Sequence, residues 1–391
     1  MNRTPRGERI HIGIFGRMGA GKSSLLNAIT GQNSAVVSPV KGTTTDPVYK
    51  TMELLPIGPV VLIDTPGIDD VGQLGGLRVE KAREIISKTD IALLVVDSTQ
   101  GLSDYERELL RVFDEMGTSF LIVYNKSDLG GNKSADGISV SCATGENIHE
   151  LKEKIAQIKI APALSRRLVA DLTRPGDLLV LVVPIDSAAP KGRLILPQQQ
   201  VIRDALEAEA VPIVTQTQRL AETLGKLKDP PRLVITDSQA FSEVSKLTPD
   251  DVWLTSFSIL MARYKGVLAD AVACVKSIDT IQNGDKILIC EGCTHHRQCE
   301  DIGTVKIPRW IKEHTSATPE YEFCSGSDFP DDLSPFKLII HCGGCMQNPR
   351  EMDFRQTAAL KAKVPMTNYG IAISHMQGIL QRCIAPFGGS L

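Results

Sequence analysis

The sequence predicts an α/β protein built from several domains. Short, continuous apolar segments, typical of buried parallel strands, alternate with amphipathic helical segments over residues 10–161. A second alternation of the same kind begins at residue 177. The length of 391 residues also exceeds what one hydrophobic core usually organises. We therefore expect three domains, which cover residues 1–165, 166–265 and 266–391.

The composition is that of an ordinary globular protein and disfavours several functional classes. Hydrophobic residues make up 42% of the chain and charged residues 23%, so we expect packed cores rather than long disordered segments. The formal net charge of -3 gives no overall attraction to nucleic acid or anionic lipid, and we expect neither as a partner. No apolar segment approaches the roughly 20 residues that span a bilayer. Residues 1–9 lack the apolar core of a secretory signal, which favours a cytoplasmic protein.

The first domain is expected to contain a doubly wound, mostly parallel sheet. Strands that alternate with helices pair in parallel and are covered by helices on both faces. A helix over residues 148–158 is followed by Pro162, which marks a boundary near residue 165. The predicted strands are Ile10–Phe15, Val60–Ile63, Ile91–Val96 and Phe120–Tyr124.

The second domain repeats the alternation on a smaller scale, and the third follows an apolar segment. We expect a helix over Trp253–Tyr264 to lead into the third domain. The second domain has no phosphate-binding loop, so a scaffold or an oligomerisation module is its simplest interpretation. Its predicted strands are Asp177–Pro184, Val211–Val214 and Leu233–Thr236, and its predicted helices are Gln198–Ala208 and Thr217–Leu227.

A phosphate-binding loop directly follows the first predicted strand. The segment Gly16–Ser23 has the spacing G-x-x-x-x-G-K-[ST] and directly precedes a predicted helix. Its glycines let backbone N–H groups surround phosphate oxygens at the start of the helix. We expect Lys22 to reach the terminal phosphates as a catalytic residue and Ser23 to bind Mg²⁺. The predicted nucleotide-binding residues here are Gly16, Gly19, Gly21, Lys22, Ser23 and Ser24.

Two further segments are typical of the γ-phosphate side of such a site. Asp64 ends a predicted strand, where its carboxylate can hold the water shell of Mg²⁺, and Gly67 follows to contact the γ-phosphate. The run Gly42–Asp46 resembles the first switch of the translation-factor-related GTPases. Thr44 is the expected catalytic and Mg²⁺-sensing threonine, with Thr43 and Thr45 as alternatives.

The third set of segments favours guanine as the base. Asn125, Lys126 and Asp128 match N-K-x-D at the end of a strand, and Asp128 can accept from the guanine N1–H and amine, which adenine does not offer. Ser141, Cys142 and Ala143 are expected to contact the guanine O6 through their backbone. Together these segments indicate a P-loop GTPase that binds GTP and Mg²⁺.

Hydrolysis by this GTPase is expected to be slow. Ile68 follows Gly67 where Ras-like enzymes place the glutamine that orients water. Asp70 is the candidate replacement, although Asp69 and Asp70 could also be solvated loop charges. Potassium-activated relatives have an asparagine where this chain has Gly19, which argues against activation by a monovalent cation.

The third domain carries a candidate metal site. Three cysteines and two histidines stand in the patterns C-x-H and H-C-G-G-C, and thiolates with imidazoles suit either a zinc ion or a cubane cluster. Nearby Cys290, Cys299 and Cys324 are interpreted as buried or incidental thiols. The histidines without partner spacing, interpreted as structural, are His11, His149, His314 and His375. The candidate ligands are Cys293, His295, His341, Cys342 and Cys345.

The whole chain resembles the HydF family, the FeFe-hydrogenase maturation GTPases. The resemblance rests on G-T-T-T-D-P-V-Y-K at 42–50, on D-T-P-G-I-D-D-V-G at 64–72 and on the two cysteine and histidine motifs. It implies a middle dimerisation domain, hence a homodimer, and a C-terminal α/β domain that binds a 4Fe-4S cluster. The implied ligands are Cys293, Cys342 and Cys345, with the fourth iron position open or weakly held by His295 or His341.

The function that this resemblance implies is that of a scaffold or carrier. The cluster domain would receive a diiron precursor from two radical S-adenosylmethionine partners and deliver it to apo FeFe-hydrogenase, while GTP would switch partner affinity. A different class, a ribosome- or RNA-associated GTPase with a structural zinc module, is the alternative. A third interpretation makes the metal fold structural and limits it to dimerisation or partner docking.

Overall fold

The protein forms two compact units, residues 1–162 and 163–391. The computed structural model describes residues 6–31, 48–65, 82–131, 136–158, 166–185, 194–292, 301–326 and 328–388. Each unit contains its own sheet system, and the α/β class predicted from the sequence is confirmed.

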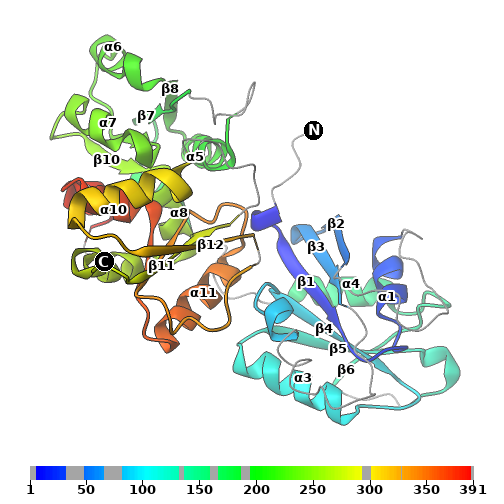
Figure 1. The fold of residues 1–391 in the computed structure, drawn as a ribbon. Coiled ribbons are helices and arrows are strands. Elements are labelled where there is room, and N and C mark those ends of the chain that lie inside the picture. Colours follow the sequence, from blue (N-terminus) through cyan, green and yellow to red (C-terminus); the bar gives the residue numbers. More distant parts are fainter. Residues whose placement is uncertain are drawn as a thin grey trace. The chain divides into compact units, whose positions relative to one another are not determined.

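The first unit is built on one six-stranded sheet in the order β2-β3-β1-β4-β5-β6. The strand β2 is antiparallel to β3, and all other neighbours are parallel. The helices α1 (Lys22–Thr30), α3 (Asp104–Glu115) and α4 (Ile148–Gln157) cover it (Figure 1). The strands are β1 (Ile10–Phe15), β2 (Val48–Leu54), β3 (Gly58–Asp64), β4 (Ile91–Asp97), β5 (Ser119–Asn125) and β6 (Gly137–Ser139).

The two faces of this sheet bury separate hydrophobic clusters. Ile12 and Ile14 of β1 pack with residues of α1 and α4 on one face, whereas Leu94 of β4 packs with residues of α3 on the other. Strands buried on both faces need continuous apolar runs, which is the pattern that the sequence shows. Because β1 lies between β3 and β4, the strand order reverses at β1, and ligands of open α/β sheets bind at such a point.

The second unit contains two four-stranded, all-parallel sheets. Their strand orders are β10-β9-β7-β8 and β12-β11-β13-β14. The strands of the first are β7 (Leu178–Val182), β8 (Val211–Thr215), β9 (Leu233–Thr236) and β10 (Trp253–Ser256). Those of the second are β11 (Lys286–Glu291), β12 (Glu320–Ser325), β13 (Leu338–His341) and β14 (Met366–Asn368).

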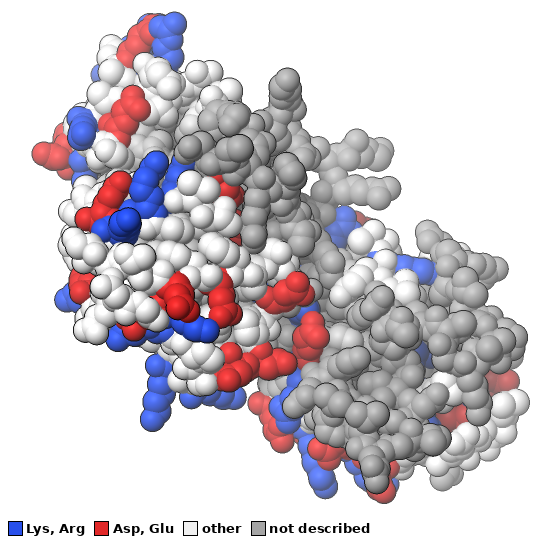
Figure 2. All heavy atoms as spheres, viewed as in Figure 1, with Lys and Arg blue, Asp and Glu red and all other residues white. Residues whose placement is uncertain are grey.

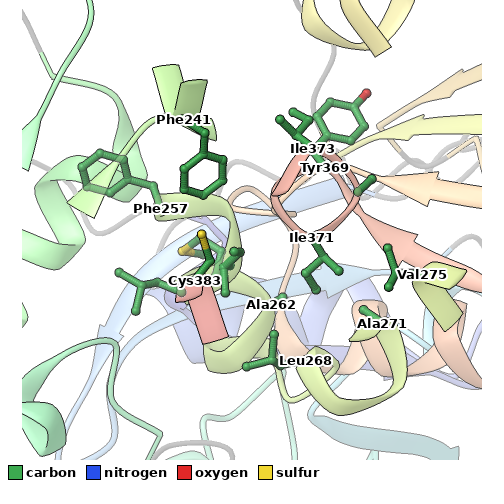
Figure 3. Packing of buried hydrophobic residues seen from close by; sticks show 14 of the residues in the cluster. Phe241, Phe257, Ala262, Leu268, Ala271, Val275, Tyr369, Ile371, Ile373 and Cys383 are labelled. Carbon is green, nitrogen blue, oxygen red and sulfur yellow. The ribbon is translucent and has the colours of Figure 1, made fainter. Parts of the chain in front are cut away.

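One continuous hydrophobic core joins the two sheets of this unit. Figure 3 shows Phe241, Phe257, Leu268 and Ile371, from four different helices, meeting in this core. The second and third predicted domains therefore fold as one compact unit, and their boundary at residue 265 stays a prediction. The helices are α5 (Leu196–Glu207), α6 (Leu220–Lys226), α7 (Phe241–Leu247), α8 (Phe257–Lys265), α9 (Leu268–Cys274), α10 (Ile307–Thr315), α11 (Pro349–Lys361), α12 (Tyr369–Met376) and α13 (Leu380–Ile384), with the short turns η7 (Val275–Thr280) and η8 (Ile302–Lys306).

The helix predicted over Trp253–Tyr264 is wrong in its first turn. The first four residues form β10, which pairs in parallel with β9, and the helix α8 begins only at Phe257. Ser256 ends the strand and caps the helix, since its side chain accepts a hydrogen bond from Ile259 N. A short apolar run fits a buried strand and a buried helix equally well, and the neighbouring strand decides between them.

Two observations on the described residues concern membrane insertion and surface charge. Within the described ranges, no helix combines the length and the apolar character needed to cross a bilayer. On the face seen in Figure 2, acidic and basic side chains are interspersed over the described surface of the second unit. This mixture agrees with the formal net charge of -3.

Candidate functional site

Glycines with positive φ shape the loop between β1 and α1. Gly16 has φ 139° and Gly21 has φ 94°, values that side-chain-bearing residues rarely adopt. A Cβ on Gly16 would lie 2.2 Å from the Val95 carbonyl oxygen, and one on Gly21 would lie 2.2 Å from Asn125 Nδ2. Only glycine fits at both positions, so the loop curls tightly and directs the start of α1 at any bound anion.

Lys22 is held inside this loop. Its Nζ donates to the carbonyl oxygens of Gly16 at 2.8 Å and Arg17 at 3.0 Å, and the residue is 6% exposed. The two carbonyl groups hold the Lys22 amine in the loop, where its charge-assisted hydrogen bonds suit it to phosphate oxygens.

The carboxylate at the end of β3 meets the first helical turn of α1. Ser23 Oγ donates to Asp64 Oδ2 at 2.7 Å, while the buried Asp64 Oδ1 has no hydrogen-bond partner among the described residues. Burial raises the pKa of Asp64, although the Ser23 hydroxyl and the Lys22 charge oppose the rise. A hydroxyl and a carboxylate with one unpartnered oxygen are hard ligands of the kind that Mg²⁺ prefers, so these residues fit that ion.

Asn125 connects the phosphate loop to the loop after β6. Its Nδ2 donates to Ala20 O at 3.0 Å, and its Oδ1 accepts from Cys142 N at 3.2 Å. Ser141 is fully buried, and its hydroxyl accepts from Thr144 N at 3.1 Å. Asn125 therefore links the phosphate loop to the loop after β6 at one edge of the sheet.

The remaining residues predicted for guanine recognition gather at the same edge. Asp128 lies exposed on a short turn after β5. Burial, and then the negative charge of Asp128, raises the pKa of the Cys142 thiol to about 11. Cys142 is therefore neutral at physiological pH and lies close to Asp128, and the contacts of both residues with a guanine base stay predictions.

Asp97 is a residue of this site that the sequence prediction missed. Lys126, at φ 65°, donates through Nζ to Asp97 Oδ2 at 2.6 Å, and Thr99 donates to Oδ1. Burial alone would raise the pKa of Asp97, but the hydrogen bonds from Lys126 and Thr99 outweigh it, and the pKa lies below its usual range. In the parallel register of β4 and β5, Asp97 pairs with Asn125. The position of Asp97 at the end of a predicted strand is the feature of the sequence that could have identified it as a site residue.

Asp97→Asn is expected to weaken GTP binding about tenfold. The substitution removes the charge that holds Lys126 in its left-handed conformation beside the guanine segment, and a hydrogen bond to a charged group contributes about 1.5–3 kcal/mol. The dissociation constant for GTP would be measured by titration calorimetry. Glu115→Gln is the control, because it breaks an exposed ion pair with Arg83 far from the site. Equal GTP affinity in Asp97→Asn and the parent would contradict this role.

Several predicted nucleotide residues lie outside the described residues. These are the switch threonine Thr44 with its alternatives Thr43 and Thr45, the γ-phosphate contact Gly67 and the candidate water-orienting Asp70. Their roles remain predictions.

In the second unit, β13 leads directly into the predicted cysteine site. The Cys342 sulfur accepts N–H groups from Gly292 at 3.0 Å and from Gly344 at 3.4 Å. Cys342 N in turn donates to Cys290 O at 2.8 Å. Backbone N–H groups aimed at a sulfur stabilise its thiolate form, which is the form that binds metal. Cys293 and His295 lie outside the described residues.

Cys345 lies beside a buried cation that the sequence did not reveal. Burial raises the pKa of the Cys345 thiol, and the Lys265 ammonium opposes that rise. Lys265 is 1% exposed and donates through Nζ to Gln347 O at 2.6 Å. A fixed positive charge in a low-dielectric setting favours a thiolate or an anionic metal cluster next to it.

Both ring nitrogens of His341, a candidate ligand, are engaged by protein groups in the arrangement seen here, and its ligand role stays a prediction. Its Nδ1 lies 2.8 Å from Cys342 O and its Nε2 lies 3.0 Å from Nη1 of the buried Arg355, so both ring nitrogens are engaged. Burial, and then the Arg355 charge, lowers the pKa of His341 to about 3. A neutral imidazole that donates to a carbonyl and accepts from a guanidinium supports the turn before Cys342.

Cys290 and Cys324, interpreted as buried or incidental thiols, are both buried. They face each other on the paired strands β11 and β12 with their sulfurs 3.0 Å apart. Cys299, the third of these thiols, lies outside the described residues.

Gly344→Ala is expected to destabilise the cysteine loop more than a matched glycine substitution elsewhere. Gly344 has φ 61°, and a Cβ there would lie 2.7 Å from Met352 Sδ. Gly378 has a similar φ of 72° but open space around its Cβ position. We expect Gly378→Ala to cost about 1 kcal/mol and Gly344→Ala about 2–4 kcal/mol of unfolding free energy, because only the latter adds a clash. Denaturant titration measures both, and equal losses would show that packing at Gly344 is unimportant.

The phosphate loop, the Asp64 carboxylate and the N-K-x-D segment at one edge of a parallel sheet define the class of the first unit, a P-loop GTPase domain. The family model described as 50S ribosome-binding GTPase matches residues 11–126. Two further models match the second unit, namely the hydrogen maturase F dimerization domain at 168–266 and the hydrogen maturase F tetramerization domain at 269–386. The chain belongs to the hydrogen maturase F family.

The individual relatives that this chain is similar to include two bacterial proteins named as GTPases. GTPase Der of Wolinella succinogenes is 34% identical over 178 residues, which are 41% of this chain and 37% of that protein. GTPase Der of Campylobacter jejuni is 31% identical over 257 residues, which are 54% of this chain and 56% of that protein. The chain thus spans about 37–56% of the length of these curated relatives.

The similar solved structures are more distant. Era of Aquifex aeolicus bound to GDP and AlF4⁻ is 20% identical with a TM-score of 0.34, and the match covers 53% of this chain and 92% of that one. The G domain of the T. maritima FeoB transporter is 22% identical with a TM-score of 0.31, covering 38% of this chain and 98% of that one. Similarity this low carries no functional argument.

The matches to the second unit support oligomerisation. The sequence predicted a homodimer through the middle segment, and the matching model there is a dimerization domain. A tetramerization model over 269–386 was not predicted. The sequence analysis assigned that segment to metal binding, with dimerisation or partner docking as one interpretation.

Proposed function

We propose that this chain is a GTP-hydrolysing scaffold that binds a 4Fe-4S cluster and delivers a diiron precursor to apo FeFe-hydrogenase. The precursor comes from two radical S-adenosylmethionine maturases, and the cluster is held by Cys293, Cys342 and Cys345. The observation that carries this proposal is the pair of backbone N–H groups, from Gly292 and Gly344, that converge on the Cys342 sulfur.

That hydrogen-bond pair supports a ligand set drawn from distant parts of the chain. Gly292 contacts Cys342 although 50 residues separate them. Cys293 is joined to Gly292 by a single peptide bond, so its Cα is about 3.8 Å from that of Gly292. A Cβ on Gly292 would lie 2.7 Å from Gln347 Oε1, so the two loops approach as closely as glycine allows. Three thiolates around one centre are therefore compatible with the described geometry.

The buried cations favour an iron-sulfur cluster as the occupant. Lys265, which is 1% exposed, places a positive charge beside Cys345. Arg355, also 1% exposed, lies behind the site, where it contacts His341, acts on Cys290 and is paired with Glu351. Thiolate ligands and sulfide give a cluster a net negative charge, which such cations stabilise. When bound, the cluster supplies an iron whose fourth position can exchange ligands, and His295 and His341 are the candidates for it.

The GTPase domain is proposed to act as a slow switch. Lys22, Ser23 and Asp64 would hold the nucleotide phosphates and Mg²⁺, which neutralises charge on the transferred phosphoryl group. Thr44, Gly67 and Asp70 are proposed to sense the γ-phosphate and position water. A nucleotide changes partner affinity only through contacts that differ between two conformations, and the two switch segments supply that difference.

Anaerobic reconstitution tests the proposal. The full chain is expected to contain about four irons and four sulfides and to give an EPR signal on reduction, and the loaded protein should activate apo FeFe-hydrogenase. A fully reconstituted sample that contains zinc and no iron would overturn the assignment. It would instead favour a GTPase with a structural zinc module, the alternative from the sequence.

A further inference from the structure

A second set of metal-ligating side chains lies away from the cysteines. Asp279, His314 and His375 each offer one ligand atom, and these atoms all lie within 4.8 Å of one another. They come from η7, from the last turn of α10 and from the last turn of α12. This group was not predicted, since both histidines were interpreted as structural from the sequence.

The distances within the group fit a metal site that needs little adjustment. Nε2 of His314 lies 2.8 Å from Asp279 Oδ1, and Nε2 of His375 lies 2.9 Å from Oδ1 and 3.1 Å from Oδ2. Ligands bound tetrahedrally at about 2.1 Å are about 3.4 Å apart, so an ion between them requires each histidine nitrogen to move about half an ångström away from the carboxylate.

The backbone under these three side chains is fixed by the hydrophobic core. Val275 and Ile278 anchor η7, Ile311 anchors α10, and Ile371 and Ile373 anchor α12, all at most 1% exposed. Figure 3 shows Val275, Ile371 and Ile373 together in that core. The ligands are thus held by rigid elements rather than by a loop, which is what a defined metal geometry needs.

The group is open to solvent on one side. The exposed fractions of the side chains are 18% for His375, 29% for His314 and 45% for Asp279. A hollow of about 500 Å³ beside them is lined in part by Trp310, His314 and Met376. An ion can therefore enter, and at least one coordination position remains available to water or to another ligand.

The three side chains are also of the types that bind a transition metal. Both imidazoles direct the same atom, Nε2, at the carboxylate of Asp279. That carboxylate could balance the charge of one protonated histidine but not of two. Neutral imidazoles with an ionised carboxylate are the ligands that zinc and ferrous iron take, whereas Mg²⁺ and Ca²⁺ prefer oxygen alone.

We propose that Asp279, His314 and His375 bind one divalent transition-metal ion of the zinc and ferrous iron class, separate from the cysteine site. This inference does not depend on the iron-sulfur cluster, because none of its ligands belongs to the cysteine motifs.

Metal analysis of the full chain tests the proposal. Chelator-treated protein would be dialysed against Zn²⁺, and the bound zinc counted in the parent and in His314→Gln and His375→Gln. Each variant is expected to retain one equivalent of zinc less than the parent, because the loss of one ligand lowers the affinity of this site for zinc at least about tenfold. His149→Gln, which alters an exposed histidine paired with Glu153 in the other unit, is the control and should match the parent.

Cobalt substitution separates this ion from any held by cysteines. Co²⁺ on thiolates gives intense charge-transfer absorption, whereas Co²⁺ on imidazole and carboxylate gives only weak visible bands. Loss of the weak bands alone in His375→Gln supports the site. Unchanged spectra and equal zinc content in the parent and both variants would show an ion-pair network only, and Mg²⁺ binding as tight as Zn²⁺ would overturn the metal class.

Discussion

Cys345→Ser is expected to lower the iron retained by the reconstituted protein by more than about tenfold, while the chain stays folded. A serine hydroxyl does not ionise near neutral pH, so the substitution removes one of three proposed thiolate ligands. The loss also leaves the buried Lys265 without the anionic neighbour that its position favours. Iron and sulfide content after desalting, with EPR of the reduced sample, measures the effect, and hydrogenase activation is expected to fall in parallel.

A matched cysteine substitution separates a ligand role from general damage. Cys274→Ser alters a half-buried thiol at the end of α9, outside the cysteine motifs, and should retain iron as the parent does. Circular dichroism and denaturant unfolding report whether Cys345→Ser remains folded. Global unfolding of that variant would support a purely structural metal fold, and full iron retention would remove Cys345 from the ligand set.

The sequence predicted the features that are contiguous in the chain. The spacing of Gly16, Gly21 and Lys22 defines a phosphate loop because all its contacts are made within one turn of backbone. The same holds for the N-K-x-D segment and for the H-C-G-G-C turn after β13. Each of these motifs needs only a strand end next to it, and apolar periodicity was enough to place those strands.

Features that depend on distant residues escaped prediction. Lys265 reaches Gln347 across 82 positions, and Lys126 reaches Asp97 across 29, so no local spacing links either pair. Asp279 and His375 are 96 positions apart and meet only because η7 and α12 share a core. His341 had suitable ligand spacing, but the buried Arg355 that occupies its Nε2 comes from α11. The packing of helices, not the motif, decides such cases.

Asp128→Asn is expected to lower GTP affinity by a factor on the order of 10² or more and to create affinity for xanthosine triphosphate. The carboxylate is proposed to accept from the guanine N1–H and amine, and each hydrogen bond to a charged group contributes about 1.5–3 kcal/mol. An asparagine amide offers a donor where the guanine amine also donates, which opposes guanine. Xanthine has a carbonyl oxygen at that position and can accept from the amide instead.

Competition binding with GTP, ATP and xanthosine triphosphate distinguishes a base contact from a loss of folding. A damaged site would lose all three nucleotides, whereas a changed acceptor should exchange one base preference for another. Asp114→Asn is the control, since it makes the same change of charge on the exposed side of α3. Guanine selectivity that survives in Asp128→Asn would mean that the backbone loop at Ser141, Cys142 and Ala143 reads the base alone. The link through Asn125 Oδ1 to Cys142 N would then be the main determinant of specificity.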